Sequence, residues 1–199
     1  MTHKFDPQNR KRLDTEQRRA IMPQTETLVR LGLKRTDTMA DIGCGAGYFT
    51  IPAAMFVRSD AADCSHNAIF ALDTSGDMLA EITEKALDLD ITNIKYQRTE
   101  EYDLKIQDAC ADFSLICNVL HEIEDKPRFL TEVLRIMKPG GTLAIIEWQK
   151  LRGDYGPSEE ERIDKTQLRN LLMLSGLSIV GDFDFVESFY AMTATKQPK

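Results

Sequence analysis

The stretch Thr38-Met39-Ala40-Asp41-Ile42-Gly43-Cys44-Gly45-Ala46-Gly47-Tyr48-Phe49-Thr50 decides the fold of this 199-residue chain. A short apolar run ends at Asp41, and three glycines follow at alternate positions before a second apolar run begins. Glycine adopts positive φ angles easily and lets another molecule approach the bare backbone. The stretch therefore predicts a strand, a tight ligand-binding turn and a helix. Its G-x-G-x-G spacing misses the G-x-G-x-x-G of dinucleotide-binding folds by one position.

Strands and helices alternate downstream of this glycine turn. We expect strands over 38–41, 68–72, 94–97, 113–117 and 143–148, with helices over 48–57, 75–87 and 125–137. A Lys-Pro-Gly-Gly turn at 138–141 precedes the fifth strand, and a last helix begins at a capping-box pattern, Asp164 and Gln167. Two further strands, 177–185 and 188–195, form a hairpin because only two residues connect them. The pattern predicts an α/β fold with a doubly wound, mostly parallel seven-stranded sheet and a C-terminal antiparallel hairpin.

Residues 1–32 lie ahead of this alternation. Thr15 is a suitable cap for a short helix over 16–22, Pro23 interrupts it, and a second helix over 24–31 ends at Gly32. Leu28 and Leu31 are expected to face the core. We expect a single domain over 1–199, in which residues 1–32 form a helical appendage and a candidate lid.

Composition excludes several classes of function. The longest apolar runs are too short for a membrane span, and the N-terminus lacks an apolar signal core, which favours the cytoplasm. Residues 1–35 carry nine Lys and Arg against four Asp and Glu, a charge of +5. Since the net charge of the chain is −7, the remaining residues carry −12. Such an acidic body argues against nucleic acid as a partner. The four cysteines have no metal-ligand spacing, so no metal site is expected.

Four features in a fixed order resemble those of a known family. They are Asp41-Ile42-Gly43-Cys44-Gly45-Ala46-Gly47, Ala71-Leu72-Asp73-Thr74-Ser75 with Met78-Leu79, Asn118-Val119-Leu120-His121-Glu122, and Leu134-Arg135-Ile136-Met137-Lys138-Pro139-Gly140-Gly141. Over about residues 33–195 the chain resembles class I S-adenosylmethionine-dependent methyltransferases, most closely the small-molecule group that includes the ubiquinone/menaquinone-biosynthesis (type 11) enzymes. The resemblance implies S-adenosyl-L-methionine as cofactor and methyl transfer to a small-molecule acceptor by direct displacement at the sulfonium methyl.

The residues of the first two features are candidate cofactor contacts. Parallel sheets bind ligands at the carboxyl ends of their strands, where Gly43, Gly45 and Gly47 would expose backbone to the methionyl part. Asp41 would receive the cofactor's ammonium group directly or through water; a carboxylate that only accepts from loop amides is the structural alternative. Asp73 ends the second strand, and a carboxylate there accepts from both ribose hydroxyls. Thr74 belongs to the same set.

Four more residues complete the implied cofactor site. Met78 would flank the adenine, although a methionine at this helical spacing is equally expected to be core packing. The resemblance implies that Glu100 faces the adenine amino group and that Glu101 contributes a backbone contact. At least one of these two acids is expected to be a solvated surface charge. Asn118 would pass close to the methionyl group.

His121 is the candidate catalytic residue. Its usual pKa of about 6.5 suits it to remove a proton from an acceptor atom, although it could equally cap the following turn. Catalysis in such enzymes is mostly alignment and desolvation. Trp148 is a candidate wall of the pocket, and residues 149–163 are a second candidate lid.

Other functions remain open at this point. A module that binds S-adenosylmethionine or S-adenosylhomocysteine without transferring a methyl group would keep the same glycines and Asp73. A nicotinamide-dependent oxidoreductase is disfavoured by the glycine spacing and the closing hairpin. A metalloid methyltransferase is a narrower alternative that would use Cys44, Cys64, Cys110 and Cys117. It is disfavoured because Cys44 belongs to the glycine turn and Cys117 to a buried strand.

Overall fold

The computed structural model describes residues 15–57, 67–150, 156–185 and 188–197. Its seven strands form one sheet in the order β3-β2-β1-β4-β5-β7-β6. Strands β1 to β5 are parallel, and β7 is antiparallel to both β5 and β6. The strands are β1 Met39–Ile42, β2 Ile69–Asp73, β3 Ile94–Arg98, β4 Ala111–Cys117, β5 Met137–Trp148, β6 Leu177–Phe185 and β7 Phe189–Lys196. The predicted mixed sheet and its closing hairpin are confirmed.

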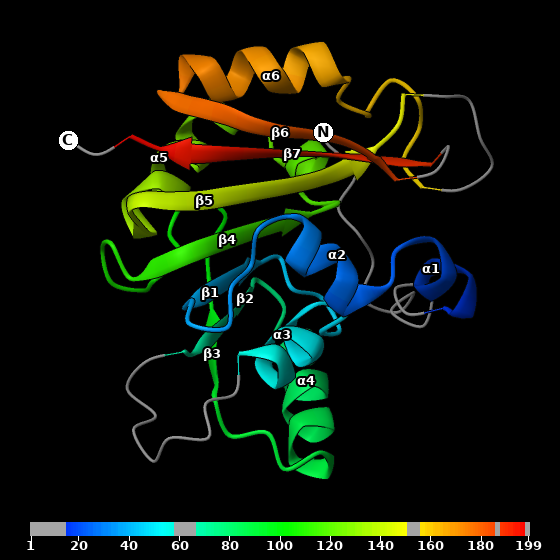
Figure 1. Ribbon diagram of the computed structural model, residues 1–199, viewed down its shortest axis with the longest axis vertical. Helices are drawn as coiled ribbons and strands as arrows, with labels where there is room; N and C mark the ends of the chain where they lie inside the picture. The colour runs from blue at the N-terminus through cyan, green and yellow to red at the C-terminus, as the bar shows by residue number, and fades with distance from the viewer. Residues whose placement is uncertain (1–14, 58–66, 151–155, 186–187, 198–199) are drawn as a thin grey trace.

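Helices cover both faces of the sheet (Figure 1). They are α1 Glu16–Ile21, α2 Gln24–Arg30, α3 Thr50–Phe56, α4 Gly76–Asp88, the 3-10 turn η2 Leu120–Glu122, α5 Lys126–Ile136 and α6 Lys165–Leu174. In Figure 1, α2, α3 and α4 lie in front of the sheet, while α5 lies behind it. The reversal of strand order beside β1 therefore produces the doubly wound arrangement.

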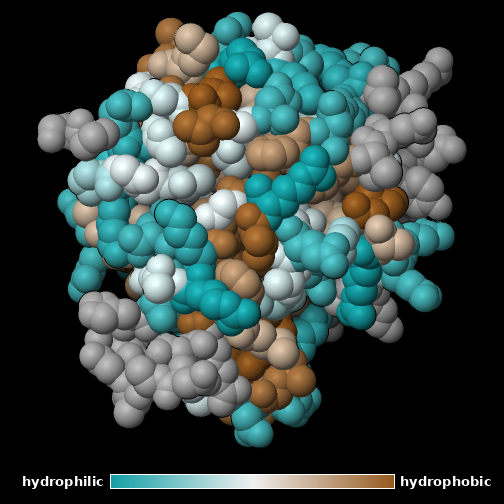
Figure 2. Space-filling view, in the orientation of Figure 1, coloured by the Kyte–Doolittle hydropathy of each residue, from teal (hydrophilic) through white to brown (hydrophobic). Residues whose placement is uncertain are grey.

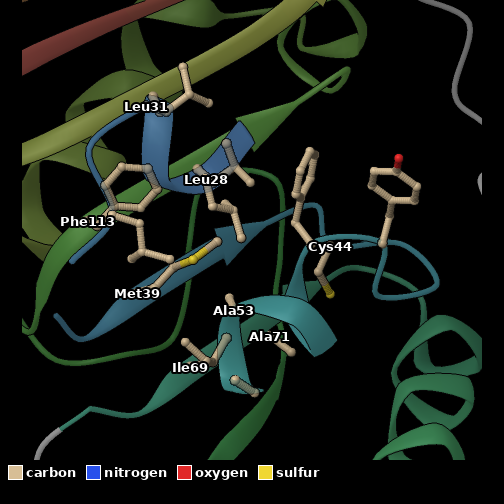
Figure 3. Close-up of a cluster of buried hydrophobic side chains, with 14 of the residues drawn as sticks. Leu28, Leu31, Met39, Cys44, Ala53, Ile69, Ala71 and Phe113 are labelled. Carbon is tan, nitrogen blue, oxygen red and sulfur yellow. The ribbon is translucent and has the colours of Figure 1, made fainter. Parts of the chain in front are cut away.

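Two buried clusters occupy the two faces. The first joins α2, α3 and α4 to β1, β2 and β4, and Figure 3 shows Leu28 and Leu31 beside Met39 and Phe113. The second joins α5 and α6 to the opposite face, with Leu130 and Leu168 fully buried. Because Leu28 and Leu31 are at most 2% exposed, the expectation that they face the core is confirmed.

Local sequence signals place most of the helix ends. The side chains of Thr15, Ser75 and Asp125 each accept a hydrogen bond from a backbone N–H of the following turn. Asp164 and Gln167 form the complete capping box. Helix α3 begins at Thr50, two residues later than expected, because residues 45–49 remain in the glycine turn. Pro52 consequently lies in the first helical turn, where its missing N–H removes no intrahelical bond.

The Lys-Pro-Gly-Gly segment at 138–141 is part of a strand and not the turn before the strand that the sequence predicted. It lies inside β5, which begins at Met137 opposite Ala111, and pairing resumes at Thr142 opposite Phe113. The irregularity between these pairs accommodates Gly140, whose φ is +75°. A Cβ on Gly141 would come 2.9 Å from the Lys138 carbonyl oxygen. The two glycines thus allow a bulged strand rather than a turn before it.

The outer surface in front of the sheet is mixed in character. Figure 2 shows teal side chains over much of this face with brown ones between them along its middle. A groove of about 560 Å³ lies between α2, α3 and α4 and is lined by Met55, Leu89, Arg35, Lys85 and neighbouring side chains. No helix within the described residues is long and apolar enough to cross a membrane.

Candidate functional site

The glycine turn is held from two sides at the carboxyl ends of the strands. Backbone N–H groups of Gly43 and Cys44 donate to the Leu72 carbonyl oxygen at 2.8 and 3.1 Å. Gly43, Gly45 and Gly47 have φ angles of +70°, +53° and +84°. A Cβ on Gly43 would lie 2.5 Å from Val119 Cγ2. The turn therefore requires glycine both for its backbone conformation and for its contact with the segment after β4.

Asp73 joins this turn to the start of α4. Its Oδ2 accepts from the Gly45 N–H at 2.9 Å, and its Oδ1 accepts from the Ser75 N–H at 2.8 Å. Burial raises the pKa of this carboxyl although the backbone donors oppose the shift. The side chain is only half-buried, and each carboxylate oxygen has a second lone pair. Asp73 can thus accept from further donors that a ligand brings.

Asp41 lies beneath the turn. It is 3% exposed, and its Oδ2 accepts from the Thr50 hydroxyl at 2.6 Å. Burial raises its pKa to about 7, against the lowering effect of this hydrogen bond. The nearby turn amides of Gly43 and Cys44 donate to Leu72 instead of to Asp41. The contact of Asp41 with an ammonium group stays a prediction. With a pKa of about 7, the Asp41 carboxyl is partly protonated at neutral pH.

The residues expected around an adenine come from two segments, the start of α4 and the loop after β3. Thr74 is exposed beside Asp73, and Met78 is 3% exposed but belongs to neither core cluster. Glu100 is exposed and forms an ion pair with Lys105 at 2.6 Å, and the backbone N–H of the preceding Thr99 donates to the Asp73 carbonyl oxygen. Glu101 is half-buried and hydrogen-bonds to the Tyr102 side chain. Glu100 thus has the character of the solvated charge that the sequence predicted for at least one of these acids.

The segment after β4 meets the turn through Val119. Asn118 adopts a φ of +55°, and within the described residues its buried Oδ1 accepts no hydrogen bond. His121 follows in η2 and is 7% exposed. An unsatisfied buried acceptor is costly, so Asn118 is suited to receive a ligand donor. The structure therefore brings Asn118 and His121 to the same edge as Asp41 and Asp73.

Glu147 is a member of this site that the sequence predictions missed. It is fully buried at the end of β5, and its Oε2 lies 2.9 Å from His121 Nδ1. Its Oε1 accepts from the His121 backbone N–H at 3.1 Å, and its Oε2 accepts from the Trp148 N–H at 3.3 Å. A carboxylate within the apolar run Leu143–Trp148 was the available signal, because buried acids require partners.

Glu147 determines the proton affinity of His121. Burial disfavours the charged imidazole, but the hydrogen bond and charge of Glu147 outweigh it and raise the pKa of His121. Glu122, whose Oε1 lies 3.9 Å from Nε2, acts in the same direction. The site thus contains a histidine that protonates more readily than in water.

Two aromatic side chains lie at the end of β5 and the start of β7. Trp148 packs on Phe189 with ring centroids 4.4 Å apart, and the Arg162 guanidinium lies 5.5 Å from the Trp148 ring. Gly156 approaches the same indole so closely that a Cβ would come 2.8 Å from it. Trp148 is half-buried, and its place at the wall of a pocket stays a prediction.

Helix α1 lies against the glycine turn. The Arg18 guanidinium stacks 4.3 Å from the Tyr48 ring and donates to Cys117 Sγ at 3.5 Å. The Tyr48 hydroxyl donates to the Met22 carbonyl oxygen at 2.7 Å. In Figure 1, α1 lies on the side toward which the arrowheads of β4 and β5 point. The sequence placed a candidate lid here but identified neither Arg18 nor Tyr48.

Three of the four cysteines, Cys44, Cys110 and Cys117, lie within the described residues. Burial raises the pKa of Cys44 well above its usual range and that of Cys117 to about 12. Cys64 lies outside the described residues. Across the part of the chain that the structure describes, no three His, Cys, Asp or Glu side chains form a group that could hold a metal ion.

Comparisons with known proteins agree on one family. The family described as "Methyltransferase domain" matches residues 40–145. A demethylmenaquinone methyltransferase of Oceanobacillus iheyensis is 25% identical over 122 residues, which are 61% of this chain and 49% of that protein. The ubiquinone/menaquinone biosynthesis C-methyltransferase UbiE of Idiomarina loihiensis is 30% identical over 60% of this chain and 45% of its own length. The chain thus spans about half the length of the curated relatives it matches.

Solved structures extend the similarity to the whole fold. A SAM-dependent methyltransferase from Aquifex aeolicus has a TM-score of 0.88 and 28% identity, covering 96% of this chain and 99% of that chain. The [4+2]-cyclase SpnF has a TM-score of 0.77 at 18% identity, over 100% of this chain and 86% of its own. A didemethyltoxoflavin N1-methyltransferase from Burkholderia thailandensis, solved with S-adenosylhomocysteine, has a TM-score of 0.69 at 18% identity, over 89% and 78%.

Proposed function

Because this chain belongs to the methyltransferase domain family, of the class I S-adenosylmethionine-dependent type, we propose that it transfers a methyl group to a small-molecule acceptor. The observation that carries the proposal is the Asp73 carboxylate. Gly45 and Ser75 hold it at the glycine turn through backbone N–H groups, yet it stays half-buried with acceptor capacity to spare.

The residues present fit S-adenosyl-L-methionine, the cofactor of this family. Asp73 would accept from the ribose hydroxyls, with Thr74 and Met78 on the adenine side. The unsatisfied Oδ1 of Asn118 and the carboxyl of Asp41 are the acceptors available to the ammonium group. Gly43 and Gly45 are partly exposed and would contact the methionyl part through their backbone, whereas Gly47 is buried beside Ile82 and would act through the conformation of the turn. Glu101 remains a proposed contact, whereas Glu100 would have to leave Lys105 to become one.

The bound cofactor supplies an activated methyl group on a sulfonium. The protein's contribution is to align the acceptor with that methyl and to keep water out, which lowers the entropic cost of the reaction. His121 would contact the acceptor, and Trp148 would form an apolar wall beside it. Residues 1–32 and 149–163 are the proposed lids, within the single domain proposed for 1–199; of these, 1–14 and 151–155 lie outside the described residues.

A small acceptor is supported by the relatives. The names of two of them refer to demethylmenaquinone and to ubiquinone/menaquinone biosynthesis, so their acceptors are quinone-type small molecules. The half-buried ring of Trp148 at the end of β5, which packs on Phe189, is an aromatic side chain that could contact such a ring. For this chain we infer a small, ring-containing acceptor.

A binding module without transferase activity is the second candidate. It is favoured by one observation, namely that the cyclase SpnF has the same fold over the whole chain. Asp73 and the glycines serve cofactor binding in either case, so these residues do not distinguish the two functions.

Calorimetry of the purified protein with S-adenosylmethionine and S-adenosylhomocysteine tests the cofactor site. We expect both to bind, and Asp73→Asn to weaken binding at least about tenfold through lost charged hydrogen bonds. Asp77→Asn is the matched control, because Asp77 is exposed in the first turn of α4. Absence of binding by the unsubstituted protein would reject the proposal. Binding without transfer of a labelled methyl to any acceptor in a broad screen would favour the binding module.

A further inference from the structure

A histidine and a carboxylate form a closed pair at the carboxyl ends of β4 and β5. Glu147 contributes no exposed surface and contacts His121 twice, at the backbone N–H and at Nδ1. Among the described residues, the Glu147 carboxylate receives its third hydrogen bond from the Trp148 N–H. A stability role alone is a poor explanation for this arrangement, because removing a carboxylate from water is expensive.

We propose that His121 is the proton acceptor of the methyl-transfer reaction, that Glu147 is its positioning residue, and that the acceptor molecule therefore carries a dissociable proton on the atom to be methylated. This inference rests on the proposed methyltransferase function and names its substrate class. That class comprises hydroxyls, thiols, primary or secondary amines, and carbon atoms that give up a proton on methylation. Tertiary amines, thioethers and trivalent arsenic, which are nucleophilic without losing a proton, fall outside it.

The geometry determines which imidazole nitrogen is available. A carboxylate only accepts hydrogen bonds, so His121 must carry its proton on Nδ1 whenever it is neutral. The lone pair then lies on Nε2. Val119 packs on Gly43, and His121 lies two residues further along the same segment, after the carboxyl end of β4. Glu147 fixes this tautomer and the orientation of the ring together.

The charged groups around the pair favour the protonated imidazole. His121 experiences the carboxylates of Glu147 on β5, Glu122 in its own turn, and Glu161 ahead of α6. On the other side, Glu147 faces the Lys126 ammonium, whose pKa burial lowers while Glu147 opposes that shift. Tyr190 and Cys117 also adjoin Glu147, and burial raises the pKa of both. The net surroundings of His121 are acidic, which stabilises an imidazolium once a proton arrives.

The step balances with the groups already named. The bond between the acceptor atom and its hydrogen breaks, and the proton goes to His121 Nε2. The electron pair left on the acceptor atom forms the new bond to the methyl carbon, while the electron pair of the broken carbon–sulfur bond stays on sulfur. The imidazolium then returns its proton to solvent; the Glu122 Oε1 lies 3.9 Å from Nε2. No oxidant, reductant or metal ion is needed.

Nuclear magnetic resonance of the ¹⁵N-histidine-labelled protein tests the pair without any acceptor. We expect neutral His121 to carry its proton on Nδ1 and to titrate above the usual value of about 6.5. Glu147→Gln should move that midpoint below 6.5, because burial remains while the charge is lost. Glu160→Gln, the same substitution at an exposed position of the loop before α6, should leave it in place. His121→Gln assigns the resonance among the three histidines.

A proton on Nε2 of the neutral ring, or a midpoint that Glu147→Gln does not change, would overturn the positioning role. The measurement on the unsubstituted protein decides this even if Glu147→Gln does not fold. Calorimetry with S-adenosylhomocysteine on the same samples separates this failure from failure of the proposed function. Glu147→Gln is expected to bind it as tightly as the unsubstituted protein does.

A panel of acceptors with labelled methyl donor tests the substrate class. We expect transfer to phenols, thiols or primary amines, and loss of about 10²-fold or more in His121→Gln. The rate of the unsubstituted protein should rise with pH through the His121 midpoint, and in Glu147→Gln this rise should move to lower pH. Transfer to trimethylamine, a dialkyl sulfide or arsenite at rates that His121→Gln leaves unchanged would overturn the inference.

Discussion

The two halves of the site are built in different ways. On the cofactor side, the glycine turn and Asp73 are joined by backbone hydrogen bonds between neighbouring strand ends, such as Gly43 to Leu72. On the acceptor side, His121 and Glu147 are joined by side chains 26 residues apart. The first half depends on backbone conformations that few residue types allow, and the second on particular side chains meeting in the fold. Backbone and side-chain substitutions should therefore affect the two halves differently.

The largest effect is expected from Asp41, beneath the cofactor half. Its folded-state pKa of about 7 is above the usual 3.8, so the folded chain holds this proton more tightly than the unfolded chain. Stability should therefore fall as pH rises from about 4 to 7 and level off above that range. Asp41→Asn should remove this fall. Its free energy of unfolding should exceed that of the unsubstituted protein by up to about 4 kcal/mol at pH 8, and the two proteins should differ little at pH 4.

Urea unfolding at pH 4 and pH 8 measures this difference, with Asp77→Asn as an exposed control. Parallel pH dependences in Asp41→Asn and the unsubstituted protein would mean that Asp41 ionises freely in the fold. In that case the turn would not shield it from water, and the contrast between the two halves would weaken.

An intermediate effect is expected where the two halves touch. Gly43→Ala combines a positive φ with a Cβ 2.5 Å from Val119 Cγ2, so we expect a loss of about 3 kcal/mol in unfolding free energy. Gly32→Ala is a control for the backbone strain alone, because its φ is +106° but nothing lies within 4 Å of the added Cβ. Urea unfolding measures both variants.

The clash can be removed separately. In a Val119→Ala background, Gly43→Ala should cost only about as much as Gly32→Ala, since the strain remains while the contact is gone. If Gly43→Ala lowered the free energy of unfolding equally in both backgrounds, the contact between the turn and Val119 would contribute nothing to the cost.

The same contrast explains what the sequence could predict. Ser75, Asp125 and the Asp164 capping box act within one helical turn, so their spacing alone located the helix ends. The glycines and Asp73 follow from strand order, because parallel strands end at one edge. Glu147 could not be assigned to His121, since nothing local specifies which strand ends lie next to each other. The bulge at Gly140 likewise depends on pairing with β4, which a turn-like sequence does not reveal.

The smallest effect is expected at Tyr48, which connects α1 to the turn. Its hydroxyl donates to the Met22 carbonyl oxygen in a buried bond, and Arg18 stacks on its ring. Tyr48→Phe keeps the ring but leaves that carbonyl without this donor, which costs about 1 to 2 kcal/mol. Because the stacking and the Gln24 bond to the Tyr48 carbonyl persist, the loss should concentrate in α1 instead of spreading through the sheet.

Hydrogen exchange of the amides in 18–22 measures this local loss, with Tyr96→Phe as control on the partly exposed edge strand β3. Faster exchange there, with β4 and β5 unchanged, would assign α1 to the cofactor half of the site. Equally faster exchange in η2 and around Glu147 would instead show that α1 holds both halves. Since Arg18 reaches Cys117 at the end of β4, this second result would identify α1 as the element through which cofactor binding and acceptor binding are coupled.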